Sequence, residues 1–166
     1  ANRIALASYE LVDQMAAINR AGVEISRQAA GPQALVFASI GPTGKMLMAG
    51  EVTPEEVQAA FAEQAAALAA AGADALVLGA PPRGTARDEG GHLVSGRIYG
   101  PMNKPLALRQ VGQAAQASNA PVIASGGIHT PEDARDFLEA GAVAVQLDSV
   151  IWIQPSAALA IIEALA

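Results

Sequence analysis

Hydrophobic positions along the chain follow two patterns: short continuous apolar runs, and spacings of three or four residues. The apolar runs are rich in Val, Ile, Leu and Ala and predict four short strands, over 34–39, 74–79, 121–125 and 142–147. The three- and four-residue spacing predicts helices over 53–71, 105–117, 131–140 and 155–165. Strands and helices therefore alternate along most of the chain.

The same spacing predicts which helical faces point inward. A leading helix over 2–30 would bury one stripe of residues, namely Leu11, Met15, Ile18, Gly22 and Ile25. The last helix would bury the apolar residues Leu159, Ile162 and Leu165. Both faces are expected to pack against the predicted sheet.

Two helix starts repeat one another. Thr53-Pro54-Glu55-Glu56 and Thr130-Pro131-Glu132-Asp133 each combine an N-cap threonine, a proline at the first helical position and acids in the first turn. Each start leads through Ala-Gly-Ala to a strand, which indicates βα units and a parallel sheet. We interpret the four acids as residues favoured by the helix dipole, rather than as paired catalytic carboxylates.

The predicted fold class is α/β, with one domain over residues 1–166 that holds four parallel βα units and a leading helix. Eight units close a (β/α)8 barrel, so four make half of a TIM barrel. The alternative is a flavodoxin-like open sheet with helices on both faces. Because a half-barrel leaves its sheet edges and inner face uncovered, we expect a homodimer that completes eight strands.

Residues 80–104 are predicted to form the longest irregular stretch. A loop of that length in a compact domain is usually functional or disordered. It holds three arginines, Arg83, Arg87 and Arg97, together with His92. The arginines would either close over a phosphate or acid substrate or remain solvated, and the solvated loop is the favoured interpretation. His92 is also expected to lie in solvent.

Composition narrows the function classes. The net charge of −6 and the ten scattered basic residues argue against nucleic acid as a partner. The absence of cysteine excludes disulfides and thiolate zinc sites, and no apolar run is long enough for a membrane span. We therefore expect a cytoplasmic protein. The chain begins without Met inside a helical pattern, which suggests a processed, trimmed or engineered start.

The turn after the strand at 121–125 carries the main candidate chemistry. Gly126 and Gly127 allow a tight turn that leaves N–H groups facing a ligand, close to the helix start at Thr130. The end of the next strand, Asp148-Ser149, would complete a phosphate cradle like that between the last two strands of many barrels. The charge of Asp148 opposes phosphate unless the side chain points away. Two other candidates, His129 and Lys45, are expected to be exposed.

Four motifs resemble, in the same order, the C-terminal half of the dihydroorotate dehydrogenase family and related flavin barrels. They are EGGHLVSG at 89–96, LALR at 106–109, GGIHTPEDA at 126–134 and AGAVAVQL at 140–147. The resemblance covers about 75–153 and implies flavin mononucleotide (FMN), with Ser95 and Gly96 along it. It implies that the residues around the FMN phosphate are Ser125, Gly126, Gly127, Ile128, Asp148 and Ser149.

Residues 1–78 resemble a different family, the homocysteine S-methyltransferases. The motifs are ANRIAL at 1–6, INRAGVEI at 18–25, SIGPTGK at 39–45 and the stretch 63–78. Both families form (β/α)8 barrels, so the chain looks like a chimera of segments 1–78 and 79–166. We expect a recombined or designed origin, with the junction near 72–78.

Neither family's chemistry is expected to be intact. The methyltransferases hold zinc through cysteines, which this chain lacks. The resemblance to the dehydrogenases implies a catalytic base and a flavin-facing lysine on elements that precede this half. Three functions stay open: a scaffold that keeps a phosphate or FMN corner for a small anionic ligand, an FMN-dependent oxidoreductase, or a structural chimera without ligand.

Overall fold

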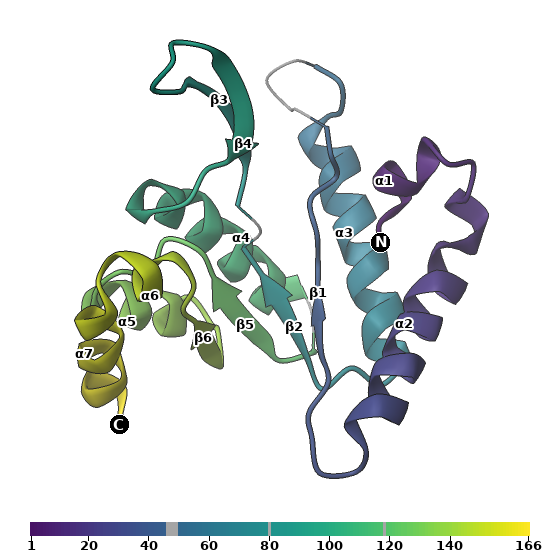
Figure 1. The fold of residues 1–166 in the computed structure, drawn as a ribbon. Coiled ribbons are helices and arrows are strands. Elements are labelled where there is room, and N and C mark those ends of the chain that lie inside the picture. The colour runs from purple at the N-terminus through teal and green to yellow at the C-terminus, as the bar shows by residue number, and fades with distance from the viewer. Residues whose placement is uncertain (46–49, 80, 118) are drawn as a thin grey trace.

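The computed structural model describes residues 1–45, 50–79, 81–117 and 119–166, and its centre is a four-stranded parallel sheet (Figure 1). The strands are β1 (Phe37–Ser39), β2 (Ala75–Leu78), β5 (Val122–Ser125) and β6 (Ala144–Gln146), side by side in the order β1-β2-β5-β6. Phe37 pairs with Ala75, Leu76 with Val122 and Ile123 with Ala144. The four predicted strands are therefore confirmed, each shorter at its ends than the apolar run.

Helices connect successive strands, as parallel strands require. They are α3 (Pro54–Ala70), α4 (Lys104–Ala117) and α5 (Pro131–Glu139), with the short helix η3 (Pro101–Asn103) before α4. Two further helices, α6 (Ser149–Ile153) and α7 (Pro155–Leu165), follow the last strand. Thr53 and Thr130 each form the predicted capping box, with Glu56 and Asp133 respectively. The interpretation of the acids as helix-start residues is therefore confirmed for Glu56 and Asp133.

The hydrophobic core lies between the sheet and its helices. On the helix side of β1 and β2, Val36, Ala38, Leu76 and Leu78 are buried. Phe137 of α5 is fully buried in the same core. Alternate strand residues such as Phe37 and Ser39 point the other way and are exposed, because successive side chains of a strand face opposite sides of the sheet.

Among the described residues, helices cover one face of the sheet, as in half of a barrel rather than in a flavodoxin-like sheet. The other, uncovered face carries an open hollow of about 450 Å³, lined by Phe37, Ser39, Val77, Ser125 and Gln146 among others. The chain exposes 10230 Å², against about 7700 Å² expected for a compact monomer of this mass. The homodimer expected from the sequence stays a prediction.

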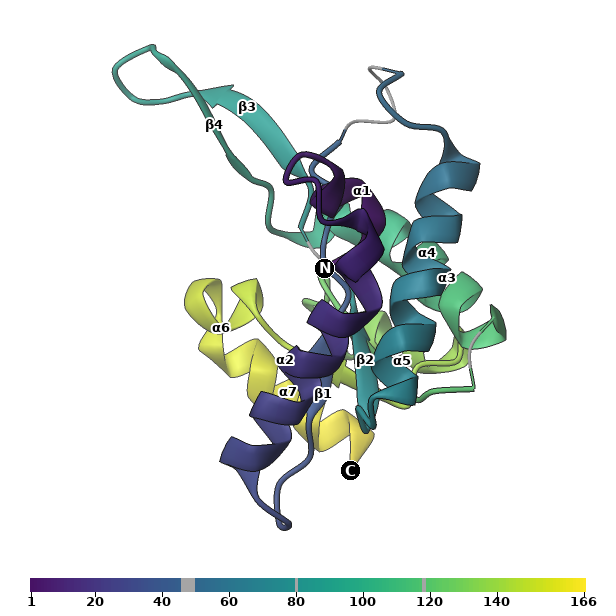
Figure 2. The same cartoon turned by 90° about the vertical axis from the view of Figure 1, so that its right-hand side faces the viewer.

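The leading helix is two helices rather than one. The chain forms α1 (Arg3–Ala7), a 3-10 turn η1 (Val12–Gln14) and α2 (Met15–Ala30). The break coincides with Glu10, whose φ of +59° no helical residue can adopt. α2 and α3 then run side by side beside β1 (Figures 1 and 2).

The predicted inward face of the last helix is wrong, and that of the first is right only in part. α2 buries Met15, as predicted, together with Asn19 and Val23, whereas Ile25 is 66% exposed. α7 buries Ile161, whereas its neighbours Leu159 and Ile162 are largely exposed. α7 carries apolar residues around most of its circumference, so spacing alone did not identify its buried stripe.

Residues 80–104 are not an irregular loop. They contain an antiparallel hairpin of β3 (Arg83–Arg87) and β4 (Leu93–Arg97), which projects from the sheet in both views (Figures 1 and 2). The turn runs through Gly90 and Gly91, and Gly91 has a φ of +79° that favours glycine. Glycine-rich loops of this length close β-hairpins, a signal that the sequence already held.

Candidate functional site

The Gly126–Gly127 turn joins β5 to the start of α5 and lies between two other backbone segments. Gly126 and Gly127 have φ angles of +96° and +77°. A Cβ on Gly127 would lie 2.4 Å from the backbone nitrogen of Lys104, and one on Gly126 would lie 2.9 Å from the carbonyl oxygen of Gly79. Both glycines are therefore needed for close backbone packing, whether or not a ligand binds.

Three consecutive peptide N–H groups at this turn are left without an internal acceptor. Among the described residues, Gly126, Gly127 and Ile128 donate no backbone hydrogen bond. By contrast, the next two N–H groups, of His129 and Thr130, both donate to Oδ2 of Asp133 at 2.9 Å. Such a run of free N–H groups is a general anion-binding arrangement.

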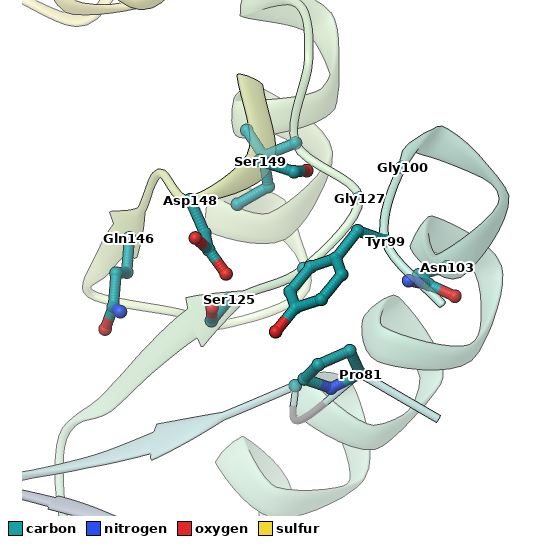
Figure 3. A pocket seen from close by; sticks show the side chains of 12 residues that line it. Pro81, Tyr99, Gly100, Asn103, Ser125, Gly127, Gln146, Asp148 and Ser149 are labelled. Carbon is teal, nitrogen blue, oxygen red and sulfur yellow. The ribbon is translucent and has the colours of Figure 1, made fainter. Parts of the chain in front are cut away.

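A small pocket with a volume of about 20 Å³, partly open to solvent, lies against this turn (Figure 3). It brings together six of the eight residues predicted from the sequence: Ser125, Gly126, Gly127, Ile128, Asp148 and Ser149. It also contains six residues that sequence reasoning missed: Gly79, Pro81, Tyr99, Gly100, Asn103 and Gln146. Gln146 was predictable, because it lies two residues before Asp148 on the same strand path and so shares its face.

Asp148 is the acidic group of the pocket. Its side chain points into the pocket beside Ser125 and Tyr99 (Figure 3). It immediately precedes α6, yet its carboxylate makes no capping hydrogen bond. A phosphate would avoid this charge only if the Asp148 side chain pointed away from the pocket. In this structure it points in.

Ser149 and His129 contact each other across the pocket's edge. The Ser149 Oγ lies 3.2 Å from Nε2 of His129, and both residues are half-buried. The prediction that His129 is exposed is therefore wrong, because the α6 start folds over the ring. A serine hydroxyl can both donate and accept hydrogen bonds. The Ser149 hydroxyl can therefore contact His129 and a ligand at the same time.

Two predicted residues lie elsewhere. Ser95 and Gly96 are on β4 of the hairpin and do not line the pocket. The Ser95 Oγ is 2.9 Å from Oγ1 of Thr85, its cross-strand partner. The structure therefore brings the phosphate-side residues together but not the two that would lie along the flavin.

The remaining candidates are in solvent, as expected. The His92 side chain is 82% exposed, with Nδ1 3.6 Å from Oδ1 of Asp88. Lys45 is exposed and pairs with Glu51 at 3.7 Å. Within the described residues, no group of three His, Cys, Asp or Glu side chains is placed to hold a metal ion. Over the same residues, no helix has the length and apolar content to cross a bilayer.

An ion cluster, which sequence reasoning also missed, links the two helices α4 and α5 beside the turn. The Lys104 Nζ lies 2.6 Å from both Asp133 Oδ1 and Asp136 Oδ2, and so joins the first residue of α4 to α5. Although burial alone would raise the pKa of Asp133, hydrogen bonds from Lys104, His129 and Thr130 lower it below its usual value. The hydrogen bonds that Lys104 donates to Asp133 and Asp136 raise the pKa of Lys104.

Acid should therefore destabilise the fold through Asp133. A carboxylate with a lowered folded-state pKa stabilises above its unfolded pKa of about 4 and loses this contribution as pH falls through the folded value. We expect Asp133→Asn to flatten the decline in unfolding free energy below about pH 4, measured by urea titration at several pH values. Part of the decline in unfolding free energy should remain in this variant, because the pKa values of Asp74 and Glu63 are also lowered. A Glu139→Gln control, at an exposed position of α5, should behave like the unmodified chain.

Comparisons with known proteins divide the chain in two overlapping parts. The model of the homocysteine S-methyltransferase family matches residues 1–83, and that of the dihydroorotate dehydrogenase family matches residues 45–166. The junction predicted near 72–78 lies inside the overlap. The chain is therefore a composite of the two families, as its motifs indicated.

Individual relatives come from the dehydrogenase side. The catalytic subunit of dihydroorotate dehydrogenase B (NAD(+)) from Geotalea uraniireducens is 50% identical over 70 residues, which is 42% of this chain and 23% of that protein. A putative dihydroorotate dehydrogenase A (fumarate) from Solibacter usitatus is 51% identical over the same length and shares. Among solved structures, dihydroorotate dehydrogenase from Eimeria tenella in complex with ferulenol superposes with a TM-score of 0.59 at 25% identity, covering 81% of this chain and 34% of that one. The matched region thus spans about a quarter to a third of these relatives.

Proposed function

Because the chain belongs to the dihydroorotate dehydrogenase family over residues 45–166 and to the homocysteine S-methyltransferase family over residues 1–83, we propose that it is a partial (β/α)8 scaffold with an anion-binding corner. The ligand class is a small molecule with a phosphate group, and FMN is the family's own candidate. The observation that carries the proposal is the run of three free N–H groups at Gly126, Gly127 and Ile128.

The pocket fits the phosphate end of FMN better than its ring. The peptide N–H groups and the Ser149 hydroxyl are donors of the kind that phosphate oxygens accept. The ring side lacks the two residues that the resemblance implies, since Ser95 and Gly96 are on the hairpin. FMN, where bound, supplies two-electron redox chemistry. This chain's residues would hold the phosphate and orient the molecule.

Asp148 is the residue that limits this binding. A carboxylate in the same pocket repels a phosphate dianion, because both are negative, and solvent screens this repulsion in part because Asp148 is exposed. We propose no natural turnover of either parent family. The resemblance implies that the methyltransferase reaction needs cysteines, and this chain has none. An FMN-dependent oxidoreductase remains the competing function, supported by family membership.

The test compares FMN with riboflavin, which has the same ring but no phosphate. We expect FMN to bind at least about tenfold more tightly than riboflavin, measured by quenching of flavin fluorescence. Asp148→Asn should tighten FMN binding by about tenfold without changing riboflavin binding. Ser149→Ala should weaken FMN binding by a few fold.

The matched control is Asp13→Asn, which removes one negative charge at an exposed site away from the pocket. It should leave the FMN affinity unchanged. Equal affinities for FMN and riboflavin, or no flavin binding, would refute the phosphate corner. Reduction of the bound flavin by dihydroorotate or by a reduced nicotinamide would favour the oxidoreductase instead.

A further inference from the structure

The hairpin places two arginines directly opposite each other at its base. β3 and β4 pair in antiparallel register with Arg83 opposite Arg97 and Thr85 opposite Ser95. The flanking N–H···O bonds, from Ile98 to Pro82 and from Asp88 to His92, place these pairs at the non-hydrogen-bonded positions of the ladder. Side chains approach most closely at such positions, and the Thr85–Ser95 hydroxyl contact of 2.9 Å shows that they do so here.

One face of the hairpin is therefore cationic and rich in hydroxyl groups. It carries Arg83, Thr85 and Arg87 from β3, with Ser95 and Arg97 from β4. Arg87 donates to the carbonyl oxygen of Gly91 at 2.7 Å. Within the described residues, Arg83 and Arg97 have no carboxylate within ion-pair distance, although Arg3, Arg27 and Arg135 all have one.

This arrangement has a cost that an anion would remove. Like charges directly opposite each other on a sheet are destabilising. The chain has 16 acidic and ten basic residues, so it has more than enough carboxylates to pair with every basic side chain. Two arginines at directly opposite strand positions can together offer several N–H donors to one carboxylate or phosphate.

Arg97 stands at the edge of the hollow on the uncovered sheet face, and Arg83 lies opposite it on β3. Arg97 lines that hollow together with Phe37 and Val77, which are apolar, Ser39 and Gln146, which are polar, and Asp148, which is acidic. Its volume of about 450 Å³ is within the range of small-molecule sites. A ligand could therefore place an anionic group at the arginines and an apolar body on the sheet.

We propose that Arg83 and Arg97 form a second anion site, which binds the carboxylate or phosphate group of a small molecule seated on the uncovered face of the sheet. Neither arginine lines the pocket at the glycine turn, although the hollow and that pocket share Gly79, Pro81, Ser125, Gln146 and Asp148. The proposal also accounts for the cationic face of the hairpin.

The experiment follows the two side chains themselves. The ¹⁵Nε–¹H signals of Arg83 and Arg97, assigned from Arg83→Gln and Arg97→Gln, are recorded while inorganic phosphate or benzoate is added at constant ionic strength. Both signals should shift with one saturable affinity. Each glutamine variant should weaken that affinity by about tenfold, and Arg97→Lys by less, because it keeps the charge but not the planar donor pair.

The controls separate this site from the glycine corner. Arg20→Gln removes an exposed arginine of α2 and should leave the affinity within about twofold. A saturable response to benzoate as well as phosphate indicates a carboxylate site, and a response to phosphate alone indicates a phosphate site. Unmoved arginine signals, or equal weakening by Arg20→Gln, overturn the proposal. Failure of FMN binding would leave these signals unaffected, so the two proposals fail separately.

Discussion

Gly79→Ala is expected to abolish cooperative folding of the chain. Gly79 directly follows β2 and has a φ of +120°, and a Cβ there would lie 1.6 Å from the carbonyl oxygen of Ser125 and 2.6 Å from its carbonyl carbon. Both atoms are backbone atoms of the neighbouring strand β5, so no side-chain rotation can relieve the clash. Separating β2 from β5 would cost more than about 4 kcal/mol, a loss that few domains survive.

The measurement is a urea titration followed by far-ultraviolet circular dichroism. Gly22→Ala is the matched control, because Gly22 lies inside α2 and a Cβ added there would meet no atom within 4 Å. That control should stabilise the protein by about 0.5–1 kcal/mol, since alanine favours a helix interior over glycine. A Gly79→Ala protein with an unchanged midpoint would contradict the close approach of the two strands.

Phe137→Ala should cost about 3–5 kcal/mol of unfolding free energy. Phe137 is fully buried on α5, in the core cluster that also contains Val111, Val122, Ala134 and Ile161. Removing its ring leaves a cavity between α5 and the sheet that the surrounding helices cannot fill. For a chain of this length, the melting temperature should fall by about 8–15 °C.

Phe37→Ala provides the comparison within the same residue type. Phe37 is 51% exposed on the uncovered face of β1, so its truncation should cost only about 1 kcal/mol. Differential scanning calorimetry of the two variants measures the contrast directly. Similar losses for both phenylalanines would mean that the face described as uncovered is packed in solution.

The sequence predicted those elements whose signals are local. Thr53 and Thr130 form their capping boxes with acids three residues away, so the helix starts were readable from four residues each. The strands were visible as short apolar runs, a pattern typical of parallel strands, although β1 exposes Phe37 and Ser39 on the uncovered face. The six residues from Ser125 to Ser149 that line the pocket followed from the same logic, since parallel strands end at one edge.

The errors concern properties that depend on distant neighbours. Which stripe of α2 or α7 is buried depends on where each helix meets the sheet, and α7 is apolar on most sides, so its sequence gives no clear preference. The break at Glu10 requires a positive φ, which the residue type did not indicate. The hairpin was missed because its strands are exposed and contain arginine and glycine, so they lack the apolar runs that marked the others.

The candidate site was only partly predictable for a related reason. Two glycines identified the turn, but their role in packing against Lys104 and Gly79 required knowledge of the segments that approach them. The ion cluster of Lys104 with Asp133 and Asp136 joins residues 29 and more positions apart. Asp148 was identified as a difficulty for phosphate binding, and only the structure showed that its carboxylate points inward.

The hairpin of β3 and β4 makes the chain easy to diversify. Its two ends lie together, joined by the 2.8 Å bond from the Ile98 N–H to the Pro82 carbonyl, and its strands pair only with each other among the described residues. It is therefore an exchangeable cassette, which could be lengthened, shortened or replaced without changing the register of the parallel sheet. A library of hairpins at this one position would alter which molecules the hollow admits, and would leave the folding determinants untouched.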